Sequence, residues 1–338
     1  MQPSDSYCIA AGSDTGNTGI FHLKRFWSKA MSGALQKQEY AEETNLDRTL
    51  LDILGLGLLP TFRFLYEQRP SFEQFEEWIA GQHSGAIPAE KITACNALFA
   101  LPGQSVETIS EAVLTADDIA FWNEHGYVIL KNAISPEDCQ AARAVIWEYL
   151  QMNENEPATW YRPNATMEGI MLPLYRHPAI DKNRNASRIR RAFEQLWGKT
   201  GLVVTTDKCG FNPPETHSFK YRGIGLHWDV SLAQPIPFGT QGILYLTDTA
   251  ANQGALTVVP GFHKIIEKWL HELPAEINPR ETDFSVFGPQ PIAANAGDFI
   301  IWDHRLPHSS SPNRASLPRL VQYINWYDPG QEKQEKWL

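Results

Sequence analysis

Short apolar segments separated by glycine and proline dominate the sequence after Gly201. They are rich in β-branched and aromatic residues, which is typical of strands. The segments are Leu202–Thr205, Gly225–Val230, Gly242–Leu246, Leu256–Val259, Asp298–Trp302 and Leu320–Trp326. Many short strands with this punctuation indicate a β-sandwich or a jelly-roll barrel.

Helical patterns precede these strands and do not alternate with them. Thr115, Ser135 and Ser187 each stand at the start of a segment with helical periodicity, and Gly126 and Gly198 follow two of these segments. Serine and threonine satisfy free amides at helix starts, whereas glycine adopts the left-handed conformation that ends many helices. Helices followed by strands favour an α+β fold over a parallel sheet with crossover helices.

The first third of the chain has helical patterns and no catalytic motif. Ser71-Phe72-Glu73-Gln74 is a capping-box pattern, which predicts a helix from about Ser71 to Ala80. We therefore divide the chain into a mostly helical N-terminal extension (1–115), a catalytic domain (116–328) and a C-terminal tail (329–338). We interpret the extension as packing on the domain, with a lid or an oligomer interface as alternatives.

The composition argues against several classes of partner and site. The 338 residues suffice for a sizeable core, and the net charge of −10 disfavours nucleic acid or an anionic membrane as a partner. Cys8, Cys95, Cys139 and Cys209 are far apart, which indicates neither a disulfide framework nor a zinc cluster. The sequence shows no signal-peptide pattern and no apolar run of about 18 residues. We expect a cytoplasmic protein, of unknown oligomeric state.

Two histidines and an aspartate form the strongest chemical pattern. In His227-Trp228-Asp229, the i, i+2 spacing directs His227 and Asp229 to one face of a strand and Trp228 to the other. With His308 from a later segment, they provide the two imidazoles and one carboxylate that bind non-haem iron and leave positions open for oxygen chemistry. His304 competes with His308 as the third ligand. A surface strand pair is the alternative for the first two residues.

Several flanking segments resemble the phytanoyl-CoA dioxygenase family of iron(II)- and 2-oxoglutarate-dependent oxygenases. Gly254–His263 is similar to a hairpin of that family, although Phe262 replaces the usual serine. Ala296–Trp302 looks like the strand that leads to the family's distal histidine, and Phe121–Leu130 resembles its opening element. The resemblance covers roughly residues 116–328.

The resemblance implies a fold, a metal site and a cosubstrate. The fold is a double-stranded β-helix, or jelly roll, buttressed by helices, and the cofactors are Fe(II), 2-oxoglutarate and O2. His227, Asp229 and His308 become the metal ligands, since only His308 has Arg319 at the family's spacing. Arg319 would bind the far carboxylate of 2-oxoglutarate, for which a guanidinium offers a rigid fork. An ordinary ion pair is the alternative for Arg319.

Further pocket residues follow from the resemblance alone. Ser310 would add a hydroxyl to the same carboxylate, Tyr245 would face the cosubstrate, and Asn212 would line the pocket. Each of the three has a core or turn role as its alternative. Asn313 matches a family asparagine, and His263 is interpreted as bracing the hairpin.

The implied activity is hydroxylation of an aliphatic C–H bond, with release of succinate and CO2. Because Asp229 is present, the related halogenases, which replace this ligand, are not indicated. We favour a free small metabolite, such as an acid, an amino acid or a natural-product intermediate, whose carboxylate meets Arg222 or a neighbour. An acyl-CoA thioester is the alternative, and its phosphates would use the basic segment from Lys182 to Arg191. Two rivals from other classes are a metal hydrolase and a non-catalytic metabolite-binding protein on the same fold.

Overall fold

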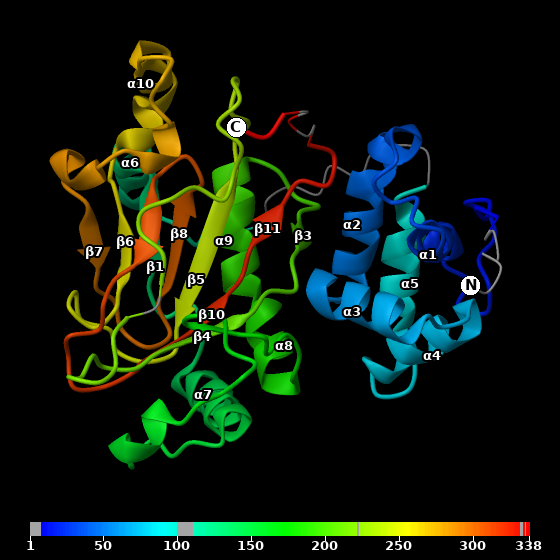
Figure 1. Cartoon of the computed structure of the whole chain (residues 1–338), viewed down its shortest axis with the longest axis horizontal. Helices are drawn as coiled ribbons and strands as arrows, with labels where there is room; N and C mark the ends of the chain where they lie inside the picture. Colours follow the sequence, from blue (N-terminus) through cyan, green and yellow to red (C-terminus); the bar gives the residue numbers. More distant parts are fainter. Residues whose placement is uncertain (1–7, 100–110, 222, 332–333, 335) are drawn as a thin grey trace. The chain divides into compact units, whose positions relative to one another are not determined.

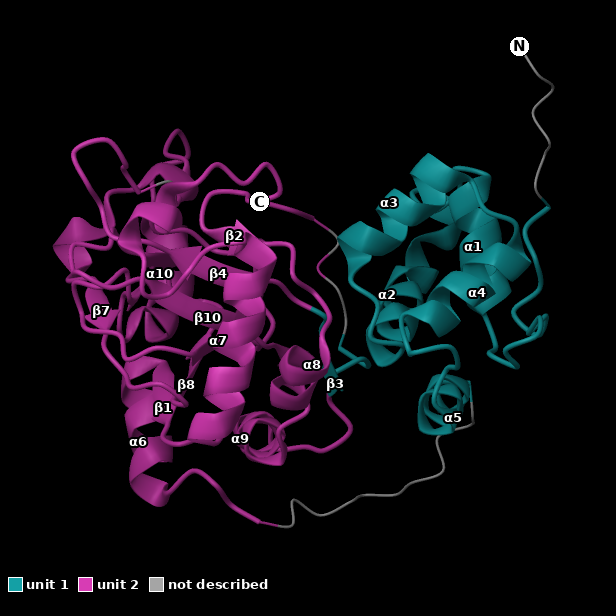
Figure 2. Ribbon diagram, turned by 90° about the horizontal axis from the view of Figure 1, so that it is seen from below, with its two compact units in different colours: residues 1–106, 203–206, 328–333 teal, residues 107–202, 207–327, 334–338 magenta. Residues whose placement is uncertain are grey.

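The computed structural model describes residues 8–99, 111–221, 223–331, 334 and 336–338. The chain divides into two compact units, which have different colours in Figure 2. The smaller unit comprises residues 1–106, 203–206 and 328–333. The larger unit comprises residues 107–202, 207–327 and 334–338.

The smaller unit consists of helices around an apolar core. Its elements are α1 (Leu23–Met31), the 3-10 helix η1 (Gln38–Glu43), α2 (Thr44–Ile53), α3 (Leu58–Gln68), α4 (Phe72–Gly81), α5 (Ala89–Ala97) and the short strand β3 (Val203–Val204). Phe26 of α1, Leu50 of α2 and Phe75 of α4 are buried in one cluster. The predicted helix start at Ser71 is confirmed, because Ser71 and Gln74 exchange the two hydrogen bonds of a capping box.

Lys29 is the centre of a buried ion-pair network in this unit. Its ammonium donates to both carboxylate oxygens of Asp47, at 2.9 and 2.7 Å, and to Glu43 at 2.7 Å. His22 lies 3.1 Å from Asp47, and Arg25 donates twice to Glu43. A fully buried ammonium is tolerated only when it is paired. The network therefore joins α1 to α2 and η1 by charge as well as by apolar packing.

No single helix in the described part of the chain is long and apolar enough to span a membrane. Among the described helices, one pair, Gln38–Ile53 and Leu58–Gln68, which is bent by 101°, reaches the required length and composition together.

The larger unit contains two antiparallel sheets (Figure 1). The first has the strand order β1-β8-β5-β10-β4-β2, and the second has the order β7-β6-β9. The strands are β1 (Tyr127–Leu130), β2 (Met171–Leu172), β4 (Cys209–Asn212), β5 (Thr240–Tyr245), β6 (Leu256–Val258), β7 (Gln290–Ile292), β8 (Phe299–Asp303), β9 (His308–Ser310), β10 (Arg319–Tyr323) and β11 (Trp326–Tyr327). Antiparallel sheets combined with helices confirm the predicted mixture of α and β structure.

Helices pack on the outer face of the first sheet. The α-helices of this unit are α6 (Ala116–His125), α7 (Pro136–Leu150), α8 (Pro178–Arg184), α9 (Ser187–Trp197) and α10 (Ile266–Glu272). Short 3-10 helices are η2 (Pro157–Tyr161), η3 (Phe262–Lys264), η4 (Pro279–Glu281) and η5 (Phe284–Phe287). Phe193 of α9 packs edge-on against Phe299 of β8, and Trp147 of α7 packs edge-on against Phe211 of β4.

Local hydrogen bonds and backbone angles confirm the predicted helix starts at Thr115 and Ser135 and the predicted end at Gly198. Ser187, in contrast, is the first residue of α9, and the N-cap is Ala186, which makes no side-chain capping hydrogen bond. Ser135 accepts a hydrogen bond from the Asp138 amide, and Thr115 forms a capping box with Asp118. Helix α9 ends at Gly198, whose φ of 64° lies in the left-handed region that glycine adopts without strain.

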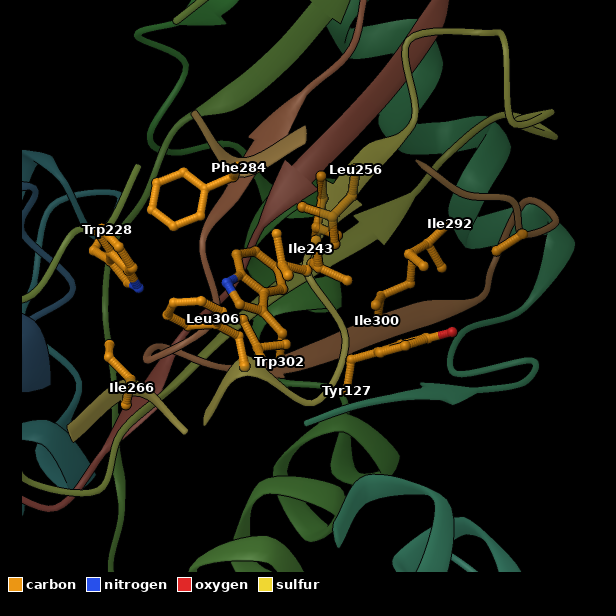
Figure 3. Close-up of a cluster of buried hydrophobic side chains, with 14 of the residues drawn as sticks. Tyr127, Trp228, Ile243, Leu256, Ile266, Phe284, Ile292, Ile300, Trp302 and Leu306 are labelled. Atoms are coloured by element: carbon orange, nitrogen blue, oxygen red, sulfur yellow. The ribbon is translucent and has the colours of Figure 1, made fainter. Parts of the chain in front are cut away.

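The main core of this unit lies between the two sheets. Ile243 of β5, Ile300 of β8 and Val321 of β10 are fully buried in one cluster with Leu256 of β6 and Ile292 of β7. Figure 3 shows four of these side chains gathered around the core. Because side chains alternate along a strand, the same inner positions of the first sheet include three polar residues, Asn212, Gln241 and Arg319.

The predicted strand Gly225–Val230 is wrong. Within it, only His227 forms a β-bridge, with His308, through two backbone hydrogen bonds of 3.0 Å. The carbonyl groups of Trp228 and Val230 accept hydrogen bonds from the side chain of Arg280. Side-chain donors therefore replace a neighbouring strand at these positions.

Candidate metal and cosubstrate site

The structure brings His227, Asp229 and His308 together. One nitrogen of each imidazole and one oxygen of the carboxylate lie within 4.8 Å of one another. Nε2 of His227 is 3.5 Å from Oδ1 of Asp229, and Nε2 of His308 is 3.3 Å from Oδ2. The bridge between the two histidines fixes the separation of their backbones, so that both rings face the same carboxylate.

Both imidazoles are oriented by backbone carbonyl groups. Nδ1 of His227 lies 2.8 Å from the carbonyl oxygen of Gly225, and Nδ1 of His308 lies 3.1 Å from that of Leu306. A carbonyl can only accept, so these contacts assign the proton to Nδ1 and leave the lone pair on Nε2. Burial, together with the neighbouring His308, lowers the pKa of His227 and favours its neutral form. A neutral imidazole with a free Nε2 is a metal ligand.

Asp229 is held by a glutamine that sequence analysis missed. Nε2 of Gln241 donates to Oδ2 of Asp229 at 2.7 Å, and Oε1 of Gln241 accepts from the indole of Trp302 at 3.1 Å. Burial acts to raise the pKa of Asp229, but the neighbouring His308 and the hydrogen bond donated by Gln241 outweigh it and lower that pKa. The carboxylate is therefore ionised, as a metal ligand must be. Its side chain is 56% exposed, which leaves this ligand accessible to solvent.

Trp228 confirms the alternation expected around the two ligands. Its side chain is 2% exposed and lies in the apolar core, with the ring edge-on to Phe284 (Figure 3). The indole nitrogen donates to the carbonyl of Arg305 at 2.8 Å. The ligands before and after Trp228 point the other way, although this segment is not a regular strand.

Arg319 is fully buried, and no described carboxylate pairs with its charge. None of its three guanidinium nitrogens has a hydrogen-bond partner among the described residues. A buried cation without a partner costs several kcal/mol, and native proteins avoid this arrangement unless a ligand completes it. The site therefore fits an anion, and the geometry of a guanidinium suits a carboxylate.

The other predicted cosubstrate residues have different surroundings. Asn212 of β4 is directly opposite Arg319 of β10 in the strand register, and its side-chain amide donates to the carbonyl of Ser311 at 3.0 Å. The Tyr245 hydroxyl donates to the carbonyl of Ile292 at 3.0 Å and accepts from an amide of β6. Its single proton is thus committed to the backbone, and Tyr245 offers no donor to a ligand.

Tyr221, next to the predicted substrate-binding Arg222 in the sequence, lies close to Ser310 and Arg319. The hydroxyl of Tyr221 donates to the carbonyl of Ser310 at 2.6 Å. Burial raises the pKa of Tyr221 to about 12, while the nearby Arg319 acts in the opposite direction. Ser310 itself is two residues after His308, so it shares a face of β9 with this ligand. Tyr221 thus connects the loop before His227 with the strand that carries His308.

The remaining histidines near the site have structural roles. His304 lies in a turn and contacts the carbonyl of Pro237 at 2.7 Å, outside the group formed by the three candidate ligands. His263 contacts the carbonyl of Asn123 at 3.3 Å and thereby braces its hairpin against α6. Asn313 donates to the carbonyl of Asn212 at 2.9 Å.

A second possible metal group, formed by His22, Glu43 and Asp47, is already occupied by the ammonium of Lys29.

A comparison with protein families agrees with this geometry. The sequence model of the phytanoyl-CoA dioxygenase family (PhyH) matches residues 122–321, more than half of the chain. The chain belongs to this family. It is therefore a dioxygenase of the class that uses iron and 2-oxoglutarate, as the resemblance of its motifs implied.

The individual relatives are distant. A Dictyostelium discoideum protein that carries the phytanoyl-CoA dioxygenase name is 23% identical over 256 residues, which cover 60% of this chain and 73% of that protein. An ectoine dioxygenase of Nocardia farcinica is 20% identical over 272 residues, which cover 69% of this chain and 85% of that protein. The solved structure of EctD from S. alaskensis with 2-oxoglutarate and 5-hydroxyectoine has 20% identity and a TM-score of 0.45, covering 67% of this chain and 80% of that chain.

Proposed function

We propose that this PhyH-family protein hydroxylates an aliphatic C–H bond of a small free metabolite. His227, Asp229 and His308 would hold Fe(II), and Arg319 would bind the far carboxylate of 2-oxoglutarate. With both groups bound, a site of this class uses O2 to oxidise a substrate C–H bond and converts 2-oxoglutarate to succinate and CO2. The observation that supports the proposal most strongly is the buried, unpaired guanidinium of Arg319.

The proposal extends to the fold that supports the site. We infer that the two antiparallel sheets of the larger unit are the two sides of a double-stranded β-helix. The shared core of β5, β8 and β10 with β6 and β7 supports this inference. We also keep residues 116–328 as the catalytic domain. Each side of the core then supplies part of the site, with His308 on β9 and Arg319 on β10.

Different residues would bind the metal and 2-oxoglutarate. Carbonyl groups orient the two histidines, and the side-chain amide of Gln241 holds Asp229. Arg319 supplies positive charge on the inner face of the first sheet, in a place without a protein counter-ion among the described residues. An anion bound there exchanges water for a guanidinium fork. Separate residues therefore control affinity for the metal and for 2-oxoglutarate.

The surroundings of the basic segment favour a free metabolite over a CoA thioester. Lys182 pairs with Asp138, Arg190 with Glu194, and Arg191 with Glu111, and Arg184 pairs with Asp181. Arg188 donates to the carbonyl of Lys131. Phosphates of CoA would need cations that are free to bind them. Arg222, the predicted partner of a substrate carboxylate, lies outside the described residues.

One paired assay tests the proposal. Succinate release would be measured with Fe(II), 2-oxoglutarate and O2, first with a panel of free acids and amino acids, and then with their CoA thioesters. We expect stimulation by at least one free acid. Stimulation by thioesters alone, lost in the Arg188→Gln and Arg191→Gln variants, would contradict the substrate class.

The same assay separates the rival classes. A metal hydrolase would turn over its substrate without 2-oxoglutarate, and a binding protein would bind a metabolite without releasing succinate. A metal hydrolase would have no need of the buried Arg319. A complete failure to consume 2-oxoglutarate, even uncoupled from substrate, would contradict the proposed reaction.

A further inference from the structure

The peptide groups on both sides of Asp229 are held by one side chain. Arg280, in the 3-10 helix η4, donates from Nη1 to the carbonyl of Trp228 at 2.9 Å and from Nη2 to the carbonyl of Val230 at 2.7 Å. These carbonyls belong to the residues immediately before and after Asp229. The guanidinium thus replaces the neighbouring strand that this segment lacks.

The same guanidinium also holds the segment 336–338. It donates to the main-chain oxygen of Leu338 from Nε at 3.1 Å and from Nη2 at 2.7 Å. It also lies over the ring of Trp337, 5.1 Å from the centroid, at a distance typical of a cation–π contact. Its donors are therefore directed to the backbone of its own chain, in contrast to those of Arg319.

Ser231 fastens this segment directly to the residues that follow Asp229. Its hydroxyl donates to the carbonyl of Lys336 at 2.6 Å and accepts from the amide of Leu338 at 3.1 Å. The amide of Leu232 donates to the oxygen of Leu338 at 3.3 Å. The segment 336–338 and the ligand-bearing stretch are thus tied at several points, all within the larger unit.

We propose that Arg280 is a positioning residue for Asp229 and that the segment 336–338 holds Arg280 in place. The inference rests on the proposed metal site. Asp229 is more than half exposed, and its stretch has no regular strand pairing beyond His227. Without Arg280, the peptide groups beside Asp229 would lose their hydrogen bonds, and the carboxylate would sample directions unsuited to the metal. Groups that orient metal ligands in this way typically contribute about 10- to 100-fold to metal affinity.

The test is the affinity for Mn2+, measured by titration calorimetry on the full chain without O2. Arg280→Gln removes the guanidinium, and Arg280→Lys keeps the charge with a single ammonium. Ser231→Ala removes the hydroxyl that binds the segment 336–338 and the amide of Ala233, and it leaves Arg280 in place. Arg190→Gln is the matched control, because it removes a half-exposed arginine of the same unit that pairs with Glu194. The unfolding temperature of each metal-free variant would be measured in parallel.

We expect Arg280→Gln to weaken Mn2+ binding about tenfold and Arg280→Lys and Ser231→Ala to weaken it by a smaller factor. Arg190→Gln should bind Mn2+ like the unaltered protein. If Arg280→Gln does not fold, the Lys variant decides. A lower unfolding temperature with unchanged Mn2+ affinity would show a purely structural role and overturn the inference. If the unaltered protein bound Mn2+ no better than Asp229→Ala, the proposed metal site itself would be wrong.

Discussion

Gln241 and Asp229 are joined by a hydrogen bond of 2.7 Å from the side-chain amide to Oδ2 of the carboxylate. The other end of the same amide accepts from Trp302, whose ring packs 5.2 Å from that of His308. Gln241 therefore orients a proposed ligand from the inner face of β5, while Arg280 holds the backbone on either side of it. Ligand geometry at this site depends on residues from several separate segments.

Replacing Gln241 by Leu should weaken metal binding without unfolding the protein. The variant loses the donor to Asp229 and leaves the indole of Trp302 without its acceptor, so we expect about tenfold weaker Mn2+ binding. Calorimetric titration would measure it. Gln140→Leu, at an exposed position of α7, is the control and should bind normally. Equal affinities of Gln241→Leu and Gln140→Leu for Mn2+ would show that Gln241 does not orient Asp229.

The stability of the smaller unit should depend on the ionisation of Glu43. Hydrogen bonding by Arg25 and Lys29 lowers the pKa of Glu43 from 4.5 to about 2. A lowered pKa means that the stabilisation is complete above the unfolded value and is lost as the pH falls from about 5 towards 2. Glu43→Gln should therefore lower the free energy of unfolding at pH 7 by about 2 kcal/mol, allowing for partial exposure.

Chemical denaturation at several pH values would check this. The difference in the free energy of unfolding between the unaltered protein and Glu43→Gln should become smaller as the pH falls below 5. A difference that stayed constant down to pH 3 would mean that the charge of Glu43 adds nothing to the network. Glu39→Gln, on the same 3-10 helix and exposed, is the control and should show little effect at any pH.

The four cysteines should differ in reactivity. Burial raises the pKa of Cys95 and Cys209 to about 12 and that of Cys139 to about 11, whereas Cys8 is exposed. Because the thiolate is the reactive form, the native protein should present one fast thiol at pH 8. A thiol-reagent titration should find this thiol missing in Cys8→Ser, and denaturation should expose the other three. A second fast thiol in native Cys8→Ser would contradict the burial of the cysteines.

Local signals in the sequence predicted several helix starts and the shared orientation of His227 and Asp229. The capping patterns at Ser71, Thr115 and Ser135 depend on neighbouring residues only, and the structure confirms them. The prediction that His227 and Asp229 point to the same side is also confirmed, because Trp228 between them is buried in the core. These features need no information about distant parts of the chain.

Features made by contacts between distant segments were not predictable in the same way. In the sequence, Gln241 is a single polar residue within a strand. Its contact with Trp302 follows only from the pairing of β5 with β8. The stretch Gly225–Val230 has strand-like composition. Its carbonyls at Trp228 and Val230, however, bind Arg280, which is 52 and 50 positions later, in place of a neighbouring strand. Tyr245 matched a family position, but its hydroxyl proton is directed to a backbone carbonyl that its sequence neighbours do not include.

The metal and the cosubstrate should be separable by mutation. Asp229→Ala removes a ligand and should abolish turnover and weaken Mn2+ binding strongly. Arg319→Met should leave Mn2+ binding within about threefold, because Arg319 makes no hydrogen bond to a described residue and acts only on the anion. Parallel titrations of both variants with Mn2+ would decide this. Loss of Mn2+ binding in a folded Arg319→Met variant would argue against separate roles.

The affinity for 2-oxoglutarate of the Mn2+-loaded protein, with and without Arg319, tests the central claim most directly. Calorimetry without O2 would compare the unaltered protein with Arg319→Met, while thermal unfolding without ligands would monitor the fold. We predict that Arg319→Met binds 2-oxoglutarate about 30-fold or more weakly, because the far carboxylate loses its buried partner. The ligand-free variant should be at least as stable as the unaltered protein, since an unpaired buried charge has been removed. Unchanged 2-oxoglutarate affinity in Arg319→Met would contradict the account.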